Sequence, residues 1–389
     1  MKNHLLVLLA SLFVVSIGFG ITLPVLPFYA ERLAMAAGSS HKMMVVHVGL
    51  LTGVFSLMQL LFAPLGGRLS DRLGRRPILP LGMAGYGLAH LLFGMATSLW
   101  LLYGARILGG ILASATIPAA TAYVADDTSD KERGRGMAWL GTAVSLGAVA
   151  GPALGGLTAW RSLHLYSRFG HFMIDSFSIP FFAAAALTFF TLLAAFRWLP
   201  ESLPPHAESA SRASVFTDWR NLGRKIGPLL GLSVFSQLGL ALFETVFVLY
   251  AQTKLGYGPA QVGIAFMVCG GVMALFQGLA VSYLSGRVSE RVQLAVGFSL
   301  MGVGIALLLL VRAPPFVFGT IGLLALGTAL GLQNAANNLG QMAGPLLGGA
   351  LFAWKAGAPY FLTSVSLLAV ATVLAWHSHK RLAAQTLAV

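Results

Sequence analysis

Apolar stretches of about twenty residues alternate along the chain with short polar segments. Residues 5–15 and 303–311 are typical apolar runs, without the alternation of polar and apolar positions that a membrane β-barrel strand requires. A helix of about twenty apolar residues crosses the roughly 30 Å hydrocarbon core of a bilayer. Because a spanning segment must satisfy its own backbone hydrogen bonds, the pattern predicts an all-α integral membrane protein embedded in a lipid bilayer.

The apolar segments predict twelve spans. We expect them near residues 4–30, 43–65, 78–96, 99–125, 137–160, 179–198, 227–251, 260–284, 292–311 and 359–376, with the crowded segment 315–354 folded as two more. If the N-terminus is cytoplasmic, seventeen lysines and arginines lie on the cytoplasmic side and seven on the opposite side. This asymmetry sets the orientation of membrane proteins. We therefore expect a multi-pass protein of the cell's inner (cytoplasmic) membrane, with both termini in the cytoplasm and an even number of spans.

A polar segment and an internal repeat divide the chain into two halves. Residues 200–226 contain the longest polar stretch and are expected to be a cytoplasmic linker between an N-terminal transmembrane bundle, residues 1–199, and a C-terminal one, residues 227–389. The sequence GAVAGPALGG at residues 147–156 recurs as GQMAGPLLGG at residues 340–349. Duplicated halves are typical of secondary transporters that bind substrate near the membrane midplane. We expect two pseudo-symmetric bundles of about six helices each.

Composition narrows the possible functions. Only 10% of the residues are charged, against about 25% in soluble domains, and the mean hydropathy is +0.80. The net charge of +13 comes from basic residues in short loops between spans, so we expect no nucleic-acid partner. Cys269 is the single cysteine, and the sequence has no phosphate-binding loop, nucleophile or metal-ligand constellation. We therefore expect a monomer that is not an enzyme and holds no metal or cofactor.

Residues 67–77, with the sequence GRLSDRLGRRP, lie between the second and third expected spans. At this loop the chain resembles the major facilitator superfamily, whose members carry such a signature between spans 2 and 3. Arg106, followed by Ile-Leu-Gly-Gly, is similar to the basic motif of span 4 in that family. The resemblance covers nearly the whole chain and implies the major facilitator fold.

Two further motifs resemble one branch of this family. Residues 147–156 are similar to the motif that marks the antiporters, and the pattern from Gly18 through Pro24 to Pro27 is similar to span 1 of drug exporters. Together they imply a tetracycline or multidrug proton antiporter. Tetracycline exporters usually carry an acidic residue early in span 1, and residues 16–20 contain none.

The loop signature can act as a latch during alternating access. Gly67 and Gly74 permit sharp turns beside a helix end. Asp71 can accept helix N-terminal amides and pair with Arg72 or Arg75, contacts that form in one state and break in the other. The alternative for this loop is a solvated segment that only sets the topology. The alternative for the Gly-Pro motif, residues 147–156 and their repeat at residues 340–349, is small-residue helix packing. The expected conformational residues are Gly67, Asp71, Arg72, Gly74, Arg75, Arg76, Gly147, Gly151, Pro152 and Gly155.

Glu244 is the only acidic residue in the middle of a strongly apolar span. A charge inside the membrane is costly and indicates function by default, so Glu244 could carry a proton or hold a cationic substrate. Gln237 and Phe247 lie on the same helix face. Arg106 is the matching cation within a span. We expect Glu244, Asp71 and Arg106 to couple protons to transport, with a neutral, hydrogen-bonded structural role for Glu244 as the alternative.

A stripe of amide side chains near the second Gly-Pro motif is the other polar feature within a span. Four of them follow helical spacing i, i+3, i+4 and i+7, so the stripe faces either a cavity or another helix rather than lipid. Gln59 is a weaker candidate in span 2. The expected substrate-binding residues are Gln59, Gln237, Phe247, Asn334, Asn337, Asn338 and Gln341.

The second half is shorter than the first around its fourth span. When Gly344 is aligned with Gly151, only residues 315–326 remain to form span 10. Twelve helical residues rise about 18 Å, which is less than the roughly 30 Å of hydrocarbon. We therefore expect a second bundle that is abbreviated at span 10.

The sequence as a whole favours a secondary active transporter that exports hydrophobic or cationic drug-like molecules in exchange for protons by alternating access. One alternative is an importer of a small polar nutrient with the same fold. The other is a membrane receptor or scaffold that does not transport.

Overall fold

The computed structural model describes residues 3–159, 167–169, 172–174, 176–203, 219–284, 287–311, 313–330 and 337–386. In the N-terminal half the elements are α1 (Asn3–Ala36), α2 (His41–Leu73), α3 (Arg75–Gly94), α4 (Leu99–Ala113), α5 (Thr116–Asp127), α6 (Asp130–Thr158), β1 (Ser167–Phe169), β2 (Phe172–Ile174) and α7 (Ile179–Trp198). In the C-terminal half they are α9 (Trp219–Tyr250), the π-helical turn η1 (Ala251–Leu255), α10 (Pro259–Leu284), α11 (Glu290–Leu308), α12 (Pro314–Leu330), α13 (Asn337–Trp354) and α14 (Ala358–Thr386).

The described helices make twelve passages through the molecule. Nine are long and apolar enough to cross a membrane, two more are shorter apolar helices, and α13 is the twelfth. Helices α4 and α5 together form one of the nine, Leu99–Asp127. The predicted all-α membrane architecture is confirmed. Its only strands among the described residues are β1 and β2, two antiparallel strands of three residues each, which the hydropathy pattern did not predict.

Local sequence explains where several helices begin and end. The Ser40 side chain accepts a hydrogen bond from the Met43 backbone N–H at the start of α2, and Ser98 does the same for Leu101 at the start of α4. Gly74 separates α2 from α3 with a φ of 99°. Gly256, with a φ of 68°, ends η1. A positive φ favours glycine because it has no Cβ.

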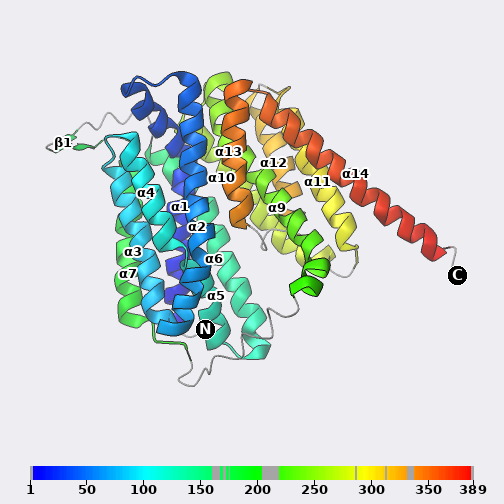
Figure 1. Cartoon of the computed structure of the whole chain (residues 1–389), viewed down its shortest axis with the longest axis horizontal. Coiled ribbons are helices and arrows are strands. Elements are labelled where there is room, and N and C mark those ends of the chain that lie inside the picture. Colours follow the sequence, from blue (N-terminus) through cyan, green and yellow to red (C-terminus); the bar gives the residue numbers. More distant parts are fainter. Residues whose placement is uncertain are drawn as a thin grey trace.

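The helices form two bundles with matching internal contacts (Figure 1). In the first bundle α1 packs on α6, and α3 packs on both α4 and α7. In the second bundle α9 packs on α13, and α11 packs on both α12 and α14. Helix α9 begins at Trp219, inside the segment expected as a linker, and the bundle boundaries at residues 199 and 227 stay a prediction.

The expected abbreviation of span 10 is visible in α12. This helix has 17 residues, whereas its counterpart in the first bundle, Leu99–Asp127, has 29. At about 1.5 Å per residue α12 rises roughly 26 Å, more than the sequence alignment allowed but still short of a full hydrocarbon core.

The bundles meet along two helix pairs, α2 with α13 and α6 with α10. A Cβ on Gly49 of α2 would lie 2.5 Å from the Pro345 carbonyl oxygen of α13, and one on Gly263 of α10 would lie 2.4 Å from the Pro152 carbonyl oxygen of α6. Such close approach requires glycine. The two contacts are related by the internal repeat, because Pro152 and Pro345 occupy the same position in it.

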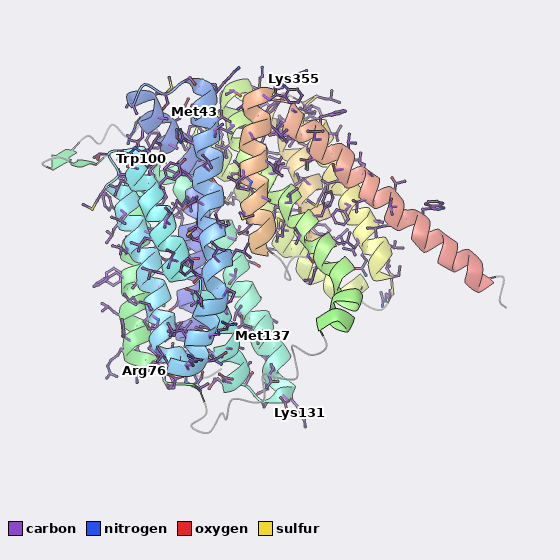
Figure 2. All side chains as sticks on the ribbon, in the orientation of Figure 1. Met43, Arg76, Trp100, Lys131, Met137 and Lys355 are labelled. Atoms are coloured by element: carbon purple, nitrogen blue, oxygen red, sulfur yellow. The ribbon has the colours of Figure 1, made fainter. Side chains whose placement is uncertain are left out.

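These contacts lie in the half of the molecule that is remote from the N-terminus. Arg76 and Lys131 mark the end that holds the N-terminus, and Met43, Trp100 and Lys355 mark the opposite end (Figure 2). Figure 1 shows the bundles close together at the Lys355 end and diverging toward the N-terminal end. At the closed end the Gln252 side-chain amide of η1 also donates a hydrogen bond to the Glu31 carboxylate of α1, which joins the bundles.

Candidate functional site

A cavity lies between the two bundles, midway along the helices. The first bundle lines it from α1, α2 and α4, and the second bundle lines it from α9 and α13. The lining residues are Phe19, Thr22, Leu23, Thr52, Phe55, Ser56, Arg106, Ala241, Glu244, Gln341 and Pro345. The cavity is mostly apolar with a few polar groups, which is the composition typical of a site for a small organic molecule.

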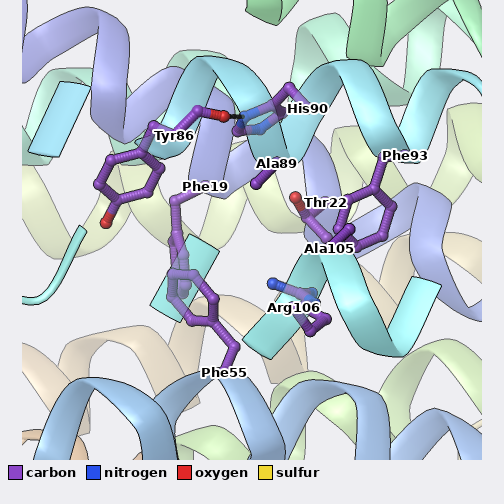
Figure 3. A pocket seen from close by; sticks show the side chains of 9 residues that line it. All are labelled: Phe19, Thr22, Phe55, Tyr86, Ala89, His90, Phe93, Ala105 and Arg106. Carbon is purple, nitrogen blue, oxygen red and sulfur yellow. Dashed lines mark hydrogen bonds between the residues drawn. The ribbon is translucent and has the colours of Figure 1, made fainter. Parts of the chain in front are cut away.

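A second cavity adjoins the first inside the N-terminal bundle (Figure 3). The two cavities share Phe19, Thr22, Phe55 and Arg106. The second is also lined by Tyr86, Ala89, His90, Phe93 and Ala105. Shared walls make them two parts of one interior site, with α9 and α13 on one side and α3 on the other.

Arg106 stands at the junction of the two cavities. It is buried, and its guanidinium carbon lies 5.2 Å from the ring centres of both Phe55 and Phe93. Its Nε has no hydrogen-bond partner among the described residues. Aromatic faces offset part of the cost of burying a cation, but they leave this N–H without an acceptor. A cation in this position can receive a negatively charged or hydrogen-bond-accepting group from the cavity.

Glu244 contributes the only carboxylate among the lining residues of the cavity between the bundles. It is partly buried, and none of the hydrogen bonds and ion pairs found in the described part of the chain reaches it. Gln341 lines the same cavity from α13. Thus the structure brings Glu244, Arg106 and Gln341 together around one space, although they come from three helices.

The other residues expected to bind substrate do not line the cavity between the bundles, or their side chains lie outside the described residues. Phe247 is fully buried and packs on the rings of Phe243 and Phe266 at centroid distances of 5.3 and 5.7 Å, so it belongs to the core of the C-terminal bundle. Gln237 is buried where α9 meets Gly340 of α13.

Gln59 donates a hydrogen bond of 3.3 Å to the hydroxyl of Tyr86, and Tyr86 lines the second cavity. Asn334 lies outside the described residues. Asn337 and Asn338 begin α13, and their side chains are likewise outside the description. The functions expected for these residues stay predictions.

The loop between α2 and α3 is held by a network of charges. One guanidinium nitrogen of Arg75 donates to the Asp71 carboxylate at 2.6 Å and to the Ser70 hydroxyl at 3.2 Å, and its Nε donates to the Asp126 carboxylate at 3.2 Å. The pairing of Asp71 with Arg75 is therefore observed. Arg72 and Arg76 have exposed side chains. Asp127, beside Asp126, lies 3.0 Å from the His4 imidazole of α1.

Glu201 completes this network, although no sequence motif pointed to it. Its carboxylate accepts hydrogen bonds from the backbone N–H groups of Arg75 at 2.8 Å and Arg76 at 3.0 Å, the first residues of α3. The N–H groups of Ser202 and Leu203 donate to it as well. Partial burial raises the pKa of Glu201, but these four backbone donors prevail and lower it below its ordinary value. The available signal was an acidic residue directly after span 6.

The two glycines of the loop differ from each other. Gly74 has the expected positive φ, and a Cβ there would lie 2.2 Å from a Glu201 carboxylate oxygen, so this position requires glycine twice over. Gly67 does not form a turn. It lies inside α2, and a Cβ there would meet no atom within 4 Å. The expectation of a sharp turn at Gly67 is wrong because α2 continues to Leu73.

The Gly-Pro repeats pack helices within each bundle as well as between them. Cβ atoms on Gly147, Gly151 and Gly155 of α6 would lie 2.4 to 2.7 Å from backbone carbonyl oxygens of α1. The equivalent glycines of α13, at positions 340, 344 and 348, face α9, where added Cβ atoms would lie 2.6 to 2.9 Å from the nearest atoms of that helix. The Pro152 carbonyl oxygen faces Gly263 of α10, and the Pro152 ring lies beside Gly20 of α1. Small residues at i, i+4 and i+8 let two helices approach closely, so the motif joins α6 to α1 on one face and to the other bundle on the opposite face.

Two bundles related by a repeat, with a cavity between them that carries a few polar groups, define the class of α-helical secondary transporters. The Major Facilitator Superfamily profile matches residues 8–329 of this chain. The chain therefore belongs to the major facilitator superfamily, and it is a multi-pass membrane protein.

Relatives with similar sequences are resistance proteins of bacteria. Multidrug resistance protein 2 of Bacillus subtilis (strain 168) is 30% identical, with 98% of this chain and 97% of that protein covered. The class G tetracycline resistance protein of Vibrio anguillarum is 30% identical over 92% of both chains. The quinolone resistance protein NorA of Staphylococcus aureus (strain MSSA476) is 26% identical over 98% of both chains.

Solved structures confirm the fold. The human organic anion transporter MFSD10 (TETRAN) has a TM-score of 0.68 and 24% identity, with 96% of this chain and 100% of that chain covered. A peptide transporter POT in complex with sulfate has a TM-score of 0.72 and 14% identity, with 98% and 95% covered. At these identities the likeness concerns the fold alone.

Proposed function

We propose that this protein exports hydrophobic or cationic drug-like molecules across the inner membrane in exchange for protons. The observation that carries the proposal is Glu244, a carboxylate on the wall of an otherwise largely apolar cavity between the bundles. The cavity suits an apolar molecule, and the carboxylate can either hold a cation or bind a proton. The relatives at about 30% identity are named for multidrug and tetracycline resistance, which supports export of drugs over import of a nutrient.

The arrangement of the bundles supports alternating access. With both termini in the cytoplasm, as the basic loops predict, the contacts of Gly49 and Gly263 close the outer side, and the bundles diverge toward the cytoplasm. This is the state in which a drug enters from inside the cell. Export then requires the contacts of Gly49 with Pro345 and of Gly263 with Pro152 to separate. The bundles must also close at the opposite end of the helices, where Asp71 lies.

Each expected coupling residue has a place in this cycle. Glu244 exchanges a proton for the substrate, and Arg106 lines the same cavity from α4. The Asp71 and Arg75 pair keeps the α2–α3 loop in shape while the inner side is open. A monomer holds the complete site, since both bundles come from one chain.

Transport by the purified protein in liposomes tests the proposal. With an acidic interior, export in exchange for protons draws ethidium into the liposomes through molecules whose cytoplasmic face points outward, and the interior pH rises as protons leave. Ethidium accumulation should disappear when nigericin dissipates the pH gradient, and empty liposomes are the control. Ethidium movement that is unaffected by the gradient would contradict proton exchange. Ethidium and protons that move in the same direction would indicate an importer.

A further inference from the structure

His90 is buried in α3 beside the second cavity, and both of its ring nitrogens face carbonyl oxygens. Nδ1 lies 2.7 Å from the Tyr86 carbonyl oxygen in its own helix, a contact drawn in Figure 3. Nε2 lies 2.9 Å from the Gly18 carbonyl oxygen of α1. Neither the proposed exporter mechanism nor the sequence motifs assign a role to this residue.

The two carbonyl oxygens favour a doubly protonated ring. A neutral imidazole carries one N–H and one lone pair, and a carbonyl oxygen can only accept. In either neutral tautomer, therefore, one of these contacts sets a lone pair against a carbonyl oxygen. Only the imidazolium, with two N–H groups, donates both hydrogen bonds.

Other groups around His90 oppose the second proton. The ring is buried, and the Arg106 guanidinium from α4 shares its cavity. The other groups that face this space are neutral: the Thr22 hydroxyl of α1, which also donates to the Gly18 carbonyl at 3.2 Å, the Tyr86 hydroxyl of α3, which Gln59 of α2 contacts, and the Phe181 ring of α7 at 6.2 Å. Glu244 and Arg106 both line the adjoining cavity, and Glu244 is the only carboxylate among its lining residues.

The sequence makes room for this contact. A Cβ on Gly18 would lie 2.8 Å from Cε1 and 3.0 Å from Nε2 of His90, so glycine lets the ring reach the carbonyl oxygen of α1. The Nδ1 contact stays within α3, whereas the Nε2 contact joins α3 to α1. Loss of the proton from Nε2 therefore removes the hydrogen bond between the two helices and leaves the one inside α3.

We infer that His90 is a second proton-binding site, in the N-terminal bundle, whose occupancy is linked through Arg106 to the charge at Glu244. While Glu244 is ionised it offsets Arg106, and His90 keeps both N–H groups and ties α1 to α3. When Glu244 takes up a proton or a cationic substrate, the offset is lost. His90 then releases its Nε2 proton to water in the cavity, and α1 is freed from α3. This inference rests on the proposed proton-coupled export.

Nitrogen NMR of the intact protein, labelled with ¹⁵N-histidine and reconstituted in lipid, tests the site directly. His90→Gln identifies the His90 signal, because the substitution removes that signal alone. His47→Gln is the matched control: the His47 ring lies 2.9 Å from the Tyr103 hydroxyl and lines neither cavity. We expect both His90 nitrogens to be protonated at pH 6, and the Nε2 proton to be lost when ethidium is added. A neutral ring at pH 6, or a charged ring that ethidium does not change, overturns the inference.

A second variant avoids dependence on a His90 substitution. Gly18→Ala places a Cβ against the ring, so the contact with the Gly18 carbonyl is displaced and His90 should be neutral at pH 6 while α1 remains folded. An unchanged imidazolium signal in this variant contradicts the assignment. Failure of the proposed function is distinguishable, because wild-type liposomes would then show no ethidium-driven proton flux even though the His90 signal titrates. The opposite result, coupled flux with an inert His90, refutes the second site alone.

Discussion

The carboxylate of Glu201 accepts a hydrogen bond of 2.8 Å from the backbone N–H of Arg75, at the first residue of α3. The same Arg75 places its guanidinium between Asp71 and Asp126. One residue therefore links the end of α7, the start of α3, the end of α2 and the end of α5. The loop signature of the family works here as the centre of a four-helix junction.

Glu201→Gln should lower thermal stability at neutral pH and remove a pH dependence at acid pH. An anion at a helix N-terminus contributes about 0.3–1 kcal/mol, and an amide oxygen accepts the same hydrogen bonds less strongly. Because the pKa of Glu201 is lowered in the folded state, its contribution is complete above its ordinary value of about 4.5 and is lost as the pH falls through the lower folded value.

Thermal unfolding in detergent between pH 3 and pH 7 measures the effect of Glu201→Gln. Glu208→Gln, in the segment expected to be a cytoplasmic linker, is the control for the loss of one glutamate. Equal unfolding temperatures for wild type and Glu201→Gln across this range would show that the carboxylate does not stabilise the junction.

Gly74→Ala and Gly67→Ala form a matched pair with opposite expectations. At Gly74 the added Cβ meets a φ of 99° and the Glu201 carboxylate, so we expect destabilisation of about 1–3 kcal/mol and reduced transport. At Gly67 the Cβ meets open space inside a helix, so we expect no loss and up to about 1 kcal/mol of stabilisation. Thermal unfolding midpoints of the two variants decide the matter. A tolerant Gly74 would contradict the junction geometry.

The fold was predictable because its signals are local and repeated. Apolar runs define the spans, and the repeats at Gly151 and Gly344 place equivalent helices in equivalent contacts. Glu244 and Arg106 were identifiable because a charge inside an apolar span is conspicuous in the sequence.

Other parts of the site depend on which helices lie side by side. Phe247 shares a helical face with Glu244 in sequence terms, yet in the structure it packs on Phe243 and Phe266. Glu201 and His90 were missed because their partners, the α3 amides and the Gly18 carbonyl, are backbone groups distant in sequence. No periodicity within one helix reports such a contact.

Gly49→Val should shift the protein away from the state in which α2 and α13 are in contact at Gly49 and Pro345. The valine methyls have no room beside the Pro345 carbonyl, and overpacking of this kind costs about 1–3 kcal/mol, which shifts an equilibrium between two states roughly 5- to 150-fold. The probe is a single Ser56→Cys in the cavity wall, in a Cys269→Ala background, labelled in intact cells with an impermeant maleimide.

Labelling of that cysteine should rise in Gly49→Val and stay at the parental level in Gly104→Val, where a Cβ meets no atom within 4 Å. Unchanged labelling in Gly49→Val would mean that this glycine contact does not close the outer side.

Asp71→Asn should impair transport more than folding. Asp71 is 45% exposed, and a pair of this kind adds only about 0.2–1 kcal/mol to stability, so expression and unfolding temperature should hold. Transport should fall strongly, because the loop must keep its shape while the bundles move. Asp130→Asn, which breaks an exposed pair with Arg133, is the control for a lost surface charge. Normal expression together with parental ethidium transport would show that the Asp71 pair is not a latch.

Glu244→Gln tests the carboxylate that lines the cavity between the bundles. The amide preserves the shape of the side chain and its capacity for hydrogen bonds but cannot take up a proton, so ethidium export coupled to protons should collapse while protein level and thermal stability hold. Burial of a neutral amide in place of a carboxylate should even remove a desolvation cost.

A paired assay with ethidium and an uncharged substrate separates the two roles of Glu244. Loss of transport of both substrates indicates proton coupling, and loss of ethidium transport alone indicates recognition of the cation. Glu132→Gln, which is exposed, controls for the substitution itself. If Glu244→Gln transports both substrates at parental rates under a pH gradient, Glu244 is structural. The coupling carboxylate would then be sought at Asp126 and Asp127, which Arg75 and His4 contact at the end of α5.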